Sequence, residues 1–232
     1  MIAATALISH AIGEGRRCEA RHLSSSTMAI SSLIQSTVAI ILMINCRELV
    51  AFMGAVGETA NLTARYLLLT LPSLPIMAIG MIGSAILRAE GAAFHAMLVT
   101  MGPGFIAMII DPIFIVAFNM GLDGAAITFW FSRICMALIA IIFVVGKHNL
   151  MARPSLRHIK KTTNVFSAIA APTILTQLAT PFGSYLLTTV ISGFGDSAVA
   201  AWAVVNRLTV LAFGGIFSLS GAVGGIFGQN FG

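Results

Sequence analysis

Charged side chains are scarce in this sequence. Asp, Glu, Lys and Arg together make up 9% of its 232 residues, whereas 58% of the residues are hydrophobic, and the mean hydropathy is +0.97. An average soluble domain carries about 25% charged residues, so this composition excludes an ordinary water-soluble protein and indicates a chain that lies in lipid. At about 20 residues for each crossing, the length allows about six or seven spans. We therefore predict an all-α, polytopic membrane protein whose first partner is the lipid bilayer.

Catalytic and metal-binding motifs are lacking as well. Cys18, Cys46 and Cys135 are far apart and show no CxxC spacing, so the sequence predicts neither a disulfide framework nor a metal site, and no cofactor is expected. HExxH, GxSxG and paired aspartates do not occur, which argues against an intramembrane enzyme. Repeated filter loops and rings of charge are also missing, which argues against a channel.

No positively charged stretch precedes the apolar residues 1–12, so the N-terminus is not predicted to be a secretory signal peptide. At about 12 residues, this segment is also too short to cross a bilayer. The chain ends abruptly in GQNFG (228–232). We therefore expect the sequence to be part of a longer membrane protein.

The longer apolar segments predict six membrane spans. Pro72 and Pro75 predict a kink in the second span. Residues 47–60 are predicted to be a loop, and residues 147–161 form a basic linker without an apolar run. The predicted spans are 23–46, 62–86, 95–118, 124–146, 165–192 and 198–232.

Lysine and arginine concentrate on alternate connections of a chain whose net charge is +5. By the positive-inside rule, the basic side is cytoplasmic, which predicts a multi-pass protein of the plasma (inner) membrane with the 147–161 linker in the cytoplasm. The other side holds Arg47, with Arg65 near its edge. Nucleic acid is not a predicted partner, because the basic charge is explained by this topology. The residues on the basic side are Arg16, Arg17, Arg21, Arg88, Lys147, Arg153, Arg157, Lys160 and Lys161.

Asp111 is the one carboxylate deep in an apolar run, and Pro112 follows it directly. A carboxylate at the middle depth of a bilayer costs at least a few kcal/mol unless it is paired, neutralised or wetted. Pro112 removes a backbone donor and is expected to bend the helix there. Asp111 is therefore either a structural acid with a partner or a carrier of an ion or proton.

Arg133 lies twelve residues after the turn near Gly121, and Asp111 lies ten residues before it. At this spacing both are expected to reach similar depth on neighbouring antiparallel helices and could pair. A pair would keep the acid ionised, whereas an Arg133 that points elsewhere would leave Asp111 able to take up a proton. Arg207, about ten residues into the last span, poses the same question.

Two short segments at the ends of the chain are similar to each other. LISHAIGEG (7–15) and GGIFGQNFG (224–232) both place polar residues before a glycine, and Gly13 aligns with Gly232. This spacing of 219 residues predicts a repeat of about six spans, an organisation common in secondary transporters.

Three longer motifs carry a resemblance to a known family: ILRAEGAAFHAM (86–97), IIDPIFIVAFNMGLDGAAIT (109–128) and FGGIFSLSGAVGGIFGQNFG (213–232). In their order and spacing the chain resembles the multidrug and toxic compound extrusion (MATE) family over essentially its whole length. The resemblance implies part of a twelve-helix, two-lobe bundle: the tail of helix two and helices three to eight.

In those terms, residues 1–146 would be an N-terminal lobe without helix one and most of helix two. Residues 147–164 would be the linker, and 165–232 the first two helices of the C-terminal lobe. The implied function is secondary active efflux of small amphipathic organic cations or drugs, in exchange for protons or sodium ions, with alternating access between the lobes. The alternative is a non-transporting fragment, or a structural membrane protein that needs the missing half.

The resemblance also implies roles for particular residues. Asp111 matches the acidic residue of helix five and, with Thr128 and Arg133, is the candidate ion-coupling group. The sequence departs from the family pattern at Ala107, where asparagine is common, and at Thr128-Phe129, where Ala-Thr is common, so the polar network around the acid is thinner. The GQNFG ending is expected to serve packing.

The candidate substrate-binding residues are Gln177, Trp202 and Asn206, on spans that would face the cleft between the lobes. Amide and aromatic groups suit flat organic cations. Trp202 is only a few residues from the outer turn, so an anchor in the aromatic belt is the other role expected for it.

Overall fold

The structure is a computed structural model that describes residues 1–52, 57–153 and 155–231, and these residues are helical almost throughout, with no strand among them. Six helices are long and apolar enough to cross a membrane, as predicted. The elements are α1 (Ile2–Gly13), α2 (Arg17–Ile44), α3 (Cys46–Phe52), α4 (Gly57–Thr70), η1 (Leu71–Ser73), α5 (Leu74–Ala89), α6 (Ala93–Pro112), η2 (Ile113–Ala117), α7 (Gly121–Ile141), η3 (Ile142–Lys147), α8 (Leu156–Ser192) and α9 (Asp196–Phe231).

The second span is bent at its prolines. The α-helix α4 gives way to the single 3-10 turn η1, which contains Pro72, and α5 restarts with Pro75 near its beginning. Proline has no backbone N–H to donate to the preceding turn, so the chain tightens into 3-10 geometry at this point. The predicted kink is confirmed.

The third span changes helix type directly after Asp111. Pro112 is the last residue of α6, and the next five residues form the wider π-helix η2. Asn119 and Gly121 then adopt positive φ values of 55° and 52°, which turn the chain into α7. Proline removes one helical hydrogen bond, and a π turn is a common local response to such an interruption.

Two predicted boundaries were wrong. Part of the predicted loop 47–60 is the short helix α3, although residues 53–56 lie outside the described part of the chain. Helix α8 begins at Leu156, inside the basic linker, nine residues before the predicted start at residue 165. Leucine, lysine and arginine are good helix formers, so the polar start of this segment continues the helix beyond its apolar stretch.

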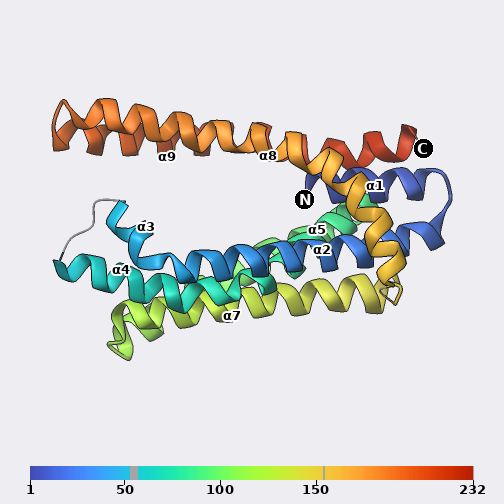
Figure 1. The fold of residues 1–232 in the computed structure, drawn as a ribbon, viewed down its shortest axis with the longest axis horizontal. Helices are drawn as coiled ribbons and strands as arrows, with labels where there is room; N and C mark the ends of the chain where they lie inside the picture. Colours follow the sequence, from blue (N-terminus) through green and yellow to red (C-terminus); the bar gives the residue numbers. More distant parts are fainter. Residues whose placement is uncertain (53–56, 154, 232) are drawn as a thin grey trace.

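The helices form two groups of unequal size (Figure 1). Helices α2, α5, α6 and α7 pack against one another, and α1 packs on α2 and α5. Helices α8 and α9 form an antiparallel pair that meets the first group near α1, at the end of the molecule where α2 begins. Arg17 and Lys147 mark this end, and Arg47 and Arg65 mark the other, because each span reverses the chain direction.

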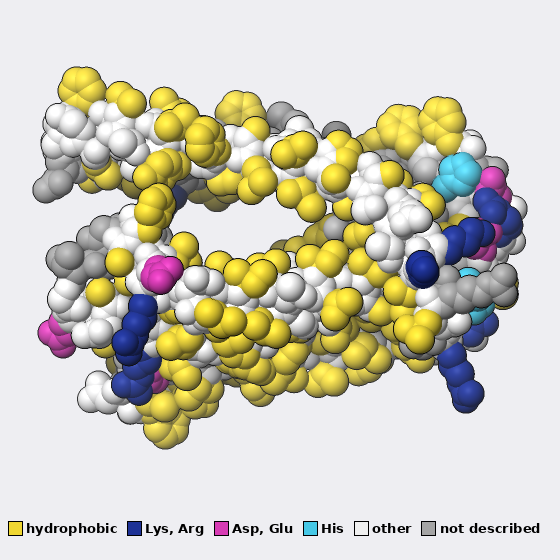
Figure 2. All heavy atoms as spheres, in the orientation of Figure 1, with side chains coloured by type: hydrophobic (Ala, Val, Ile, Leu, Met, Phe, Trp, Pro, Cys, Tyr) yellow, Lys and Arg dark blue, Asp and Glu magenta, His cyan; other side chains and the backbone are white. Residues whose placement is uncertain are grey.

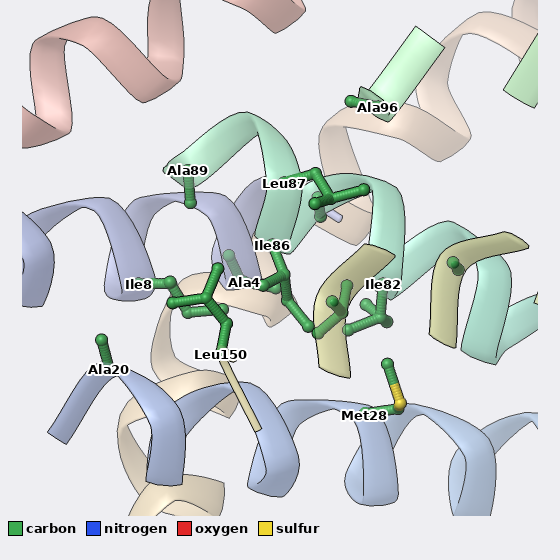
Figure 3. Close-up of a cluster of buried hydrophobic side chains, with 14 of the residues drawn as sticks. Ala4, Ile8, Ala20, Met28, Ile82, Ile86, Leu87, Ala89, Ala96 and Leu150 are labelled. Atoms are coloured by element: carbon green, nitrogen blue, oxygen red, sulfur yellow. The ribbon is translucent and has the colours of Figure 1, made fainter. Parts of the chain in front are cut away.

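The main hydrophobic core lies where α1, α2, α5 and α8 converge. Figure 3 shows Ile8, Ile86, Leu87 and Leu150 packed together there, and the first three of them are completely buried. By contrast, nearly all of the apolar residues of α9 between 197 and 215 are exposed. The contacts that hold the two groups together therefore lie at one end.

At the other end the two groups separate. Figure 2 shows an opening between the α8–α9 pair and the other helices, with hydrophobic side chains along its walls. The helix backbones of the two groups pack together near α1, the closed end of this hollow, and stand apart near the turns of α3–α4 and α8–α9, which we call its open end. In the view of Figure 2, side chains also lie across the open end.

Candidate functional site

Asp111 lies in the last turn of α6, where its side chain is half-buried. It is residue 19 of the 25 in the span Ala93–Ala117, so it sits in the outer part of the span rather than at its middle. Within the described ranges, the Asp111 carboxylate forms neither an ion pair nor a hydrogen bond. A membrane carboxylate without a protein partner is compensated by water, a proton or an ion.

Arg133 does not pair with Asp111. Its Nη1 atom donates to Ser73 Oγ at 2.5 Å and to the Thr70 carbonyl at 3.5 Å, and its guanidinium lies 4.0 Å from the centre of the Phe129 ring. Of the two arrangements that the sequence left open, the structure therefore has the one in which the arginine points elsewhere.

The partners of Arg133 are a consequence of the bend in the second span. Where the helix tightens at Pro72, carbonyl groups lose their helical donors and need others, because a bare carbonyl in the membrane is costly. Side chains of α7 supply them. Trp130 Nε1 donates to the Leu69 carbonyl at 2.6 Å, and Arg133, one turn further along, reaches Thr70.

Thr128 is fully buried, and its hydroxyl donates to the Gly124 carbonyl of its own helix at 3.1 Å. A Cβ on Gly124 would come 2.8 Å from the Phe114 carbonyl, so α7 and η2 approach closely there. Residues one turn along from such a contact share its face, which puts Thr128 and Asp111 at about the same level of two antiparallel helices. By the same register Arg133 lies about one turn or more deeper, roughly 5–9 Å along the axis. The depths of Asp111 and Arg133, which were predicted to be similar, therefore differ by about one turn or more, because the Gly124–Phe114 contact does not pair the two helices symmetrically about Gly121.

The structure does not gather the three candidate substrate residues into one pocket. Gln177 and Asn206 are exposed on α8 and α9, and Trp202 is half-buried. An apolar depression of about 440 Å³ on α8 is lined by Leu178, Ala179, Pro181 and Phe182, and Gln177 is not among its lining residues. The Trp202 Nε1 atom is buried without a hydrogen-bond acceptor in the described part of the chain.

A second cavity, of about 380 Å³, lies where α1, α2, α5 and α8 converge. Met77 and Met81 of α5 give it a flexible apolar wall, and Gln35 and Ser31 of α2 give it a polar one. Methionine adapts its shape to different apolar groups, and the Gln35 side chain forms no hydrogen bond within the described ranges. This cavity therefore combines adaptable apolar surface with free polar groups, as a small-molecule site does.

The closed end depends on unusually close helix contacts. A Cβ on Gly228 of α9 would lie well inside 3.0 Å of Ser9 Oγ on α1, and one on Gly13 would meet the Gln229 carbonyl. A Cβ on Gly225 would lie 2.7 Å from the Arg88 carbonyl. The absence of side chains lets the helix backbones come close, as in other small-residue contacts between membrane helices.

Hydrogen bonds and charges strengthen this end. The Gln229 side-chain amide donates to the Ala89 carbonyl at 2.6 Å. Glu90 lies 2.6 Å from His148 Nδ1 and 3.8 Å from an Arg17 nitrogen, so the starts and ends of several helices meet around one carboxylate. The packing role predicted for the GQNFG ending is confirmed for Gly228 and Gln229, and Gly232 lies outside the described residues.

Sequence reasoning missed several residues that shape these sites. Gln35 lies within the predicted span 23–46, but nothing in the sequence singled it out or paired α2 with Met77 across a cavity. Trp130 and Ser73 were missed entirely. The prolines did signal freed carbonyls, but the groups that bind them come from a helix about 60 residues away.

The sequence and the fold are both similar to those of known proteins. Residues 1–114 match a family model named MatE. The chain superposes on a variant of the MATE transporter VcmN of Vibrio cholerae with a TM-score of 0.90 and 28% identity, over 98% of this chain and 52% of VcmN. These similarities show that the chain has the fold of part of a MATE transporter.

Two further proteins are similar to this chain over part of their own length. The multidrug export protein MepA of Staphylococcus aureus is 28% identical over 167 residues, 69% of this chain and 36% of MepA. A MOP superfamily transporter of Pyrococcus furiosus shares the fold, with a TM-score of 0.87 and 24% identity over 99% of this chain and 53% of that protein. The chain is thus a multi-pass membrane protein that spans about half the length of its solved MATE relatives.

Proposed function

We propose that these helices export amphipathic drugs or organic cations by secondary active antiport, with alternating access between an N-terminal lobe (1–146) and a C-terminal lobe that begins at 165. The observation that carries this proposal is the hollow between the two helix groups, whose backbones pack together at one end and stand apart at the other. A transporter needs such a state, and a second in which the closed end has opened. The export function of the relative MepA supports the choice of cargo.

The cavity beside Gln35 is the proposed first binding place for the cargo. It lies at the closed end of the hollow, and its methionines and its free amide suit ligands that are flat, apolar and partly polar. Gln177 and Asn206, which α8 and α9 expose, would contact the cargo along the open part together with the half-buried Trp202.

Asp111 is the proposed ion-coupling residue, with Thr128 at the same level and Arg133 deeper on the same neighbouring helix. A carboxylate without a protein partner can bind a proton or a sodium ion without first breaking an ion pair. The contact of Arg133 with Ser73 supports a different role for the arginine: it holds the bend of the second span, and thus the shape of the lobe around Asp111.

The topology follows the distribution of basic residues. We infer that the closed end, which carries Arg16, Arg17 and the 147–161 linker, lies in the cytoplasm at the plasma (inner) membrane. The hollow then opens to the outside, which is the direction of export.

A second candidate function is that the chain alone does not transport. The MATE relatives are about twice as long, and α9 exposes nearly all of its apolar surface between 197 and 215. Exposed membrane helices of this kind are surfaces for lipid or for further helices.

One experiment separates the two candidates. The chain and a chimera that adds the remaining helices of VcmN are reconstituted separately in vesicles, and uptake of a fluorescent organic cation is followed under an imposed proton or sodium gradient. We expect gradient-driven transport by the chimera and its loss in the Asp111→Asn variant. Asp123→Asn is the matched control, because Asp123 pairs with Arg65 at the open end. Undiminished coupled transport by the Asp111→Asn chimera would reject the coupling role, and transport by the 232-residue chain alone would reject the second candidate.

A further inference from the structure

A cavity of about 810 Å³ opens where α1, the beginning of α2 and the beginning of α8 meet. Its lining changes character along the helices, from charged and polar residues at the helix starts to apolar residues further along the spans. Figure 2 shows basic and histidine side chains gathered at this end of the molecule. The apolar lining residues are Ala6, Leu7, Ala11, Leu23, Val165 and Ile169.

The charged residues that line the cavity are Arg16, Glu19 and Lys161. Arg16 is paired with Glu19 and with Glu14. Within the described ranges no carboxylate is within ion-pair distance of the Lys161 ammonium group. Lys161 is therefore the lining cation that has no protein partner.

A hydroxyl at the same place also lacks a protein partner. Thr162 is 5% exposed and lines the cavity, and its hydroxyl forms no hydrogen bond to any residue that the structure describes. The hydroxyl is therefore free to donate to an acceptor on a ligand in the cavity. His22 and His158 stack beside it with ring centres 4.3 Å apart, and their ring nitrogens add further donors.

We propose that this cavity binds the headgroup of an anionic phospholipid, with an acyl chain along its apolar wall. The unpaired ammonium of Lys161, the Thr162 hydroxyl and the imidazoles suit a phosphate, and basic pockets between membrane helices are known to take such headgroups. The same positive charge disfavours the organic cations that the transporter is proposed to export. The site also joins α2 to α8 across the two helix groups, and it does not depend on the transport proposal.

The test measures lipid binding to the purified 232-residue protein in detergent by native mass spectrometry. Phosphatidylglycerol and phosphatidylcholine with identical acyl chains are compared, and glycerol phosphate serves as the headgroup without a chain. We expect phosphatidylglycerol to bind at least about fivefold more tightly than phosphatidylcholine, the equivalent of about 1 kcal/mol for one basic side chain. Glycerol phosphate is expected not to compete at equal concentration.

Neighbouring residues on α8 provide matched controls. Lys161→Gln is expected to weaken phosphatidylglycerol binding about fivefold. Lys160→Gln removes the same charge from a residue that does not line the cavity, so it should leave the binding within about twofold. Thr162→Val should weaken binding and Thr163→Val should not, since the Thr163 hydroxyl already donates to the Ile159 carbonyl at 2.8 Å.

A bulkier side chain tests the apolar wall without touching the charges. Val165→Trp is expected to abolish the preference for phosphatidylglycerol, whereas Val210→Trp, at an exposed site on α9, leaves it intact. Equal binding of the two phospholipids, or equal losses at Lys160 and Lys161, would overturn the proposal in favour of general surface charge. Full competition by glycerol phosphate would overturn the lipid identity in favour of a free phosphate ligand.

Discussion

Single atoms decide how closely α1 and α9 approach at the closed end. Gly228 faces Ser9, which is completely buried, so even one added methyl group has no room. We predict that Gly228→Ala lowers the free energy of unfolding by about 1–3 kcal/mol, the usual cost of overpacking. Thermal unfolding of the purified protein in detergent measures the change.

The control for this prediction is another glycine of the same helix. Gly224 is exposed, and a Cβ there would meet nothing within 4 Å, so Gly224→Ala should not destabilise the protein. Removing the opposing side chain with Ser9→Gly should restore part of the stability of Gly228→Ala. If the two glycine variants unfold alike, close contact at Gly228 is not what holds this end together.

Asp111 and Arg133 should behave as independent residues. Asp111 has no partner within the described ranges, so Asp111→Asn is predicted to change the unfolding free energy by no more than about 0.5 kcal/mol. Arg133→Met removes the hydrogen bonds to Ser73 and Thr70 and should cost about 1–2 kcal/mol or more. In the double variant the two effects should add, whereas an interaction energy above about 0.5 kcal/mol would mean that the two side chains pair after all.

At the scale of whole elements, the bend between α4 and α5 depends on a hydrogen bond that a side chain of α7 donates. Trp130 satisfies the Leu69 carbonyl that the 3-10 turn leaves without a helical donor. We predict that Trp130→Phe, which keeps the aromatic ring and removes the donor, lowers stability by about 1–2 kcal/mol. Trp202→Phe is the matched control, because its Nε1 has no acceptor in the part of the chain that the structure describes. Equal losses in the two variants would assign the effect to ring packing rather than to the bend.

The elements themselves were largely predictable from the sequence. Apolar runs of about 20 residues specify membrane helices wherever they occur, and Pro72 and Pro75 marked the bend, because both signals are local. The start of α8 was missed because its polar first turns form helix by propensity, without an apolar pattern. The short helix α3 was missed because seven residues carry too little periodicity to be read.

The candidate site was less predictable, because it depends on which helices meet. Asp111 stood out in the sequence, but the direction of Arg133 follows from its contacts with Ser73 and the Thr70 carbonyl, at the bend of another span. Gln35 and Met77 come together only through the packing of α2 against α5. Such pairings are set by side-chain fit between distant segments, which no short window of sequence contains.

At the scale of the whole molecule, the two similar segments 7–15 and 224–232 belong to helices that pack together. Helix α1 contacts α9, and a Cβ on Gly13 would meet the Gln229 carbonyl. The repeat that aligns Gly13 with Gly232 stays a prediction, because Gly232 lies outside the described residues. Opening the closed end requires separating these two segments, and their contact is made mostly of glycine and backbone, with little apolar side chain to expose.

The topology of the whole molecule can be tested with its own cysteines. Cys18 is exposed at the closed end, whereas Cys46 is buried and Cys135 is half-buried, so a membrane-impermeant maleimide should react mainly with Cys18. If the closed end is cytoplasmic, Cys18 in intact cells should be labelled only after permeabilisation. A variant with Cys18→Ser and Glu58→Cys carries the reactive thiol at the open end instead, because Glu58 is exposed at the start of α4, and it should be labelled without permeabilisation. The reverse pattern would place the basic linker outside the cell and would make the open hollow face the cytoplasm, a direction of access that suits loading of a cargo rather than its release.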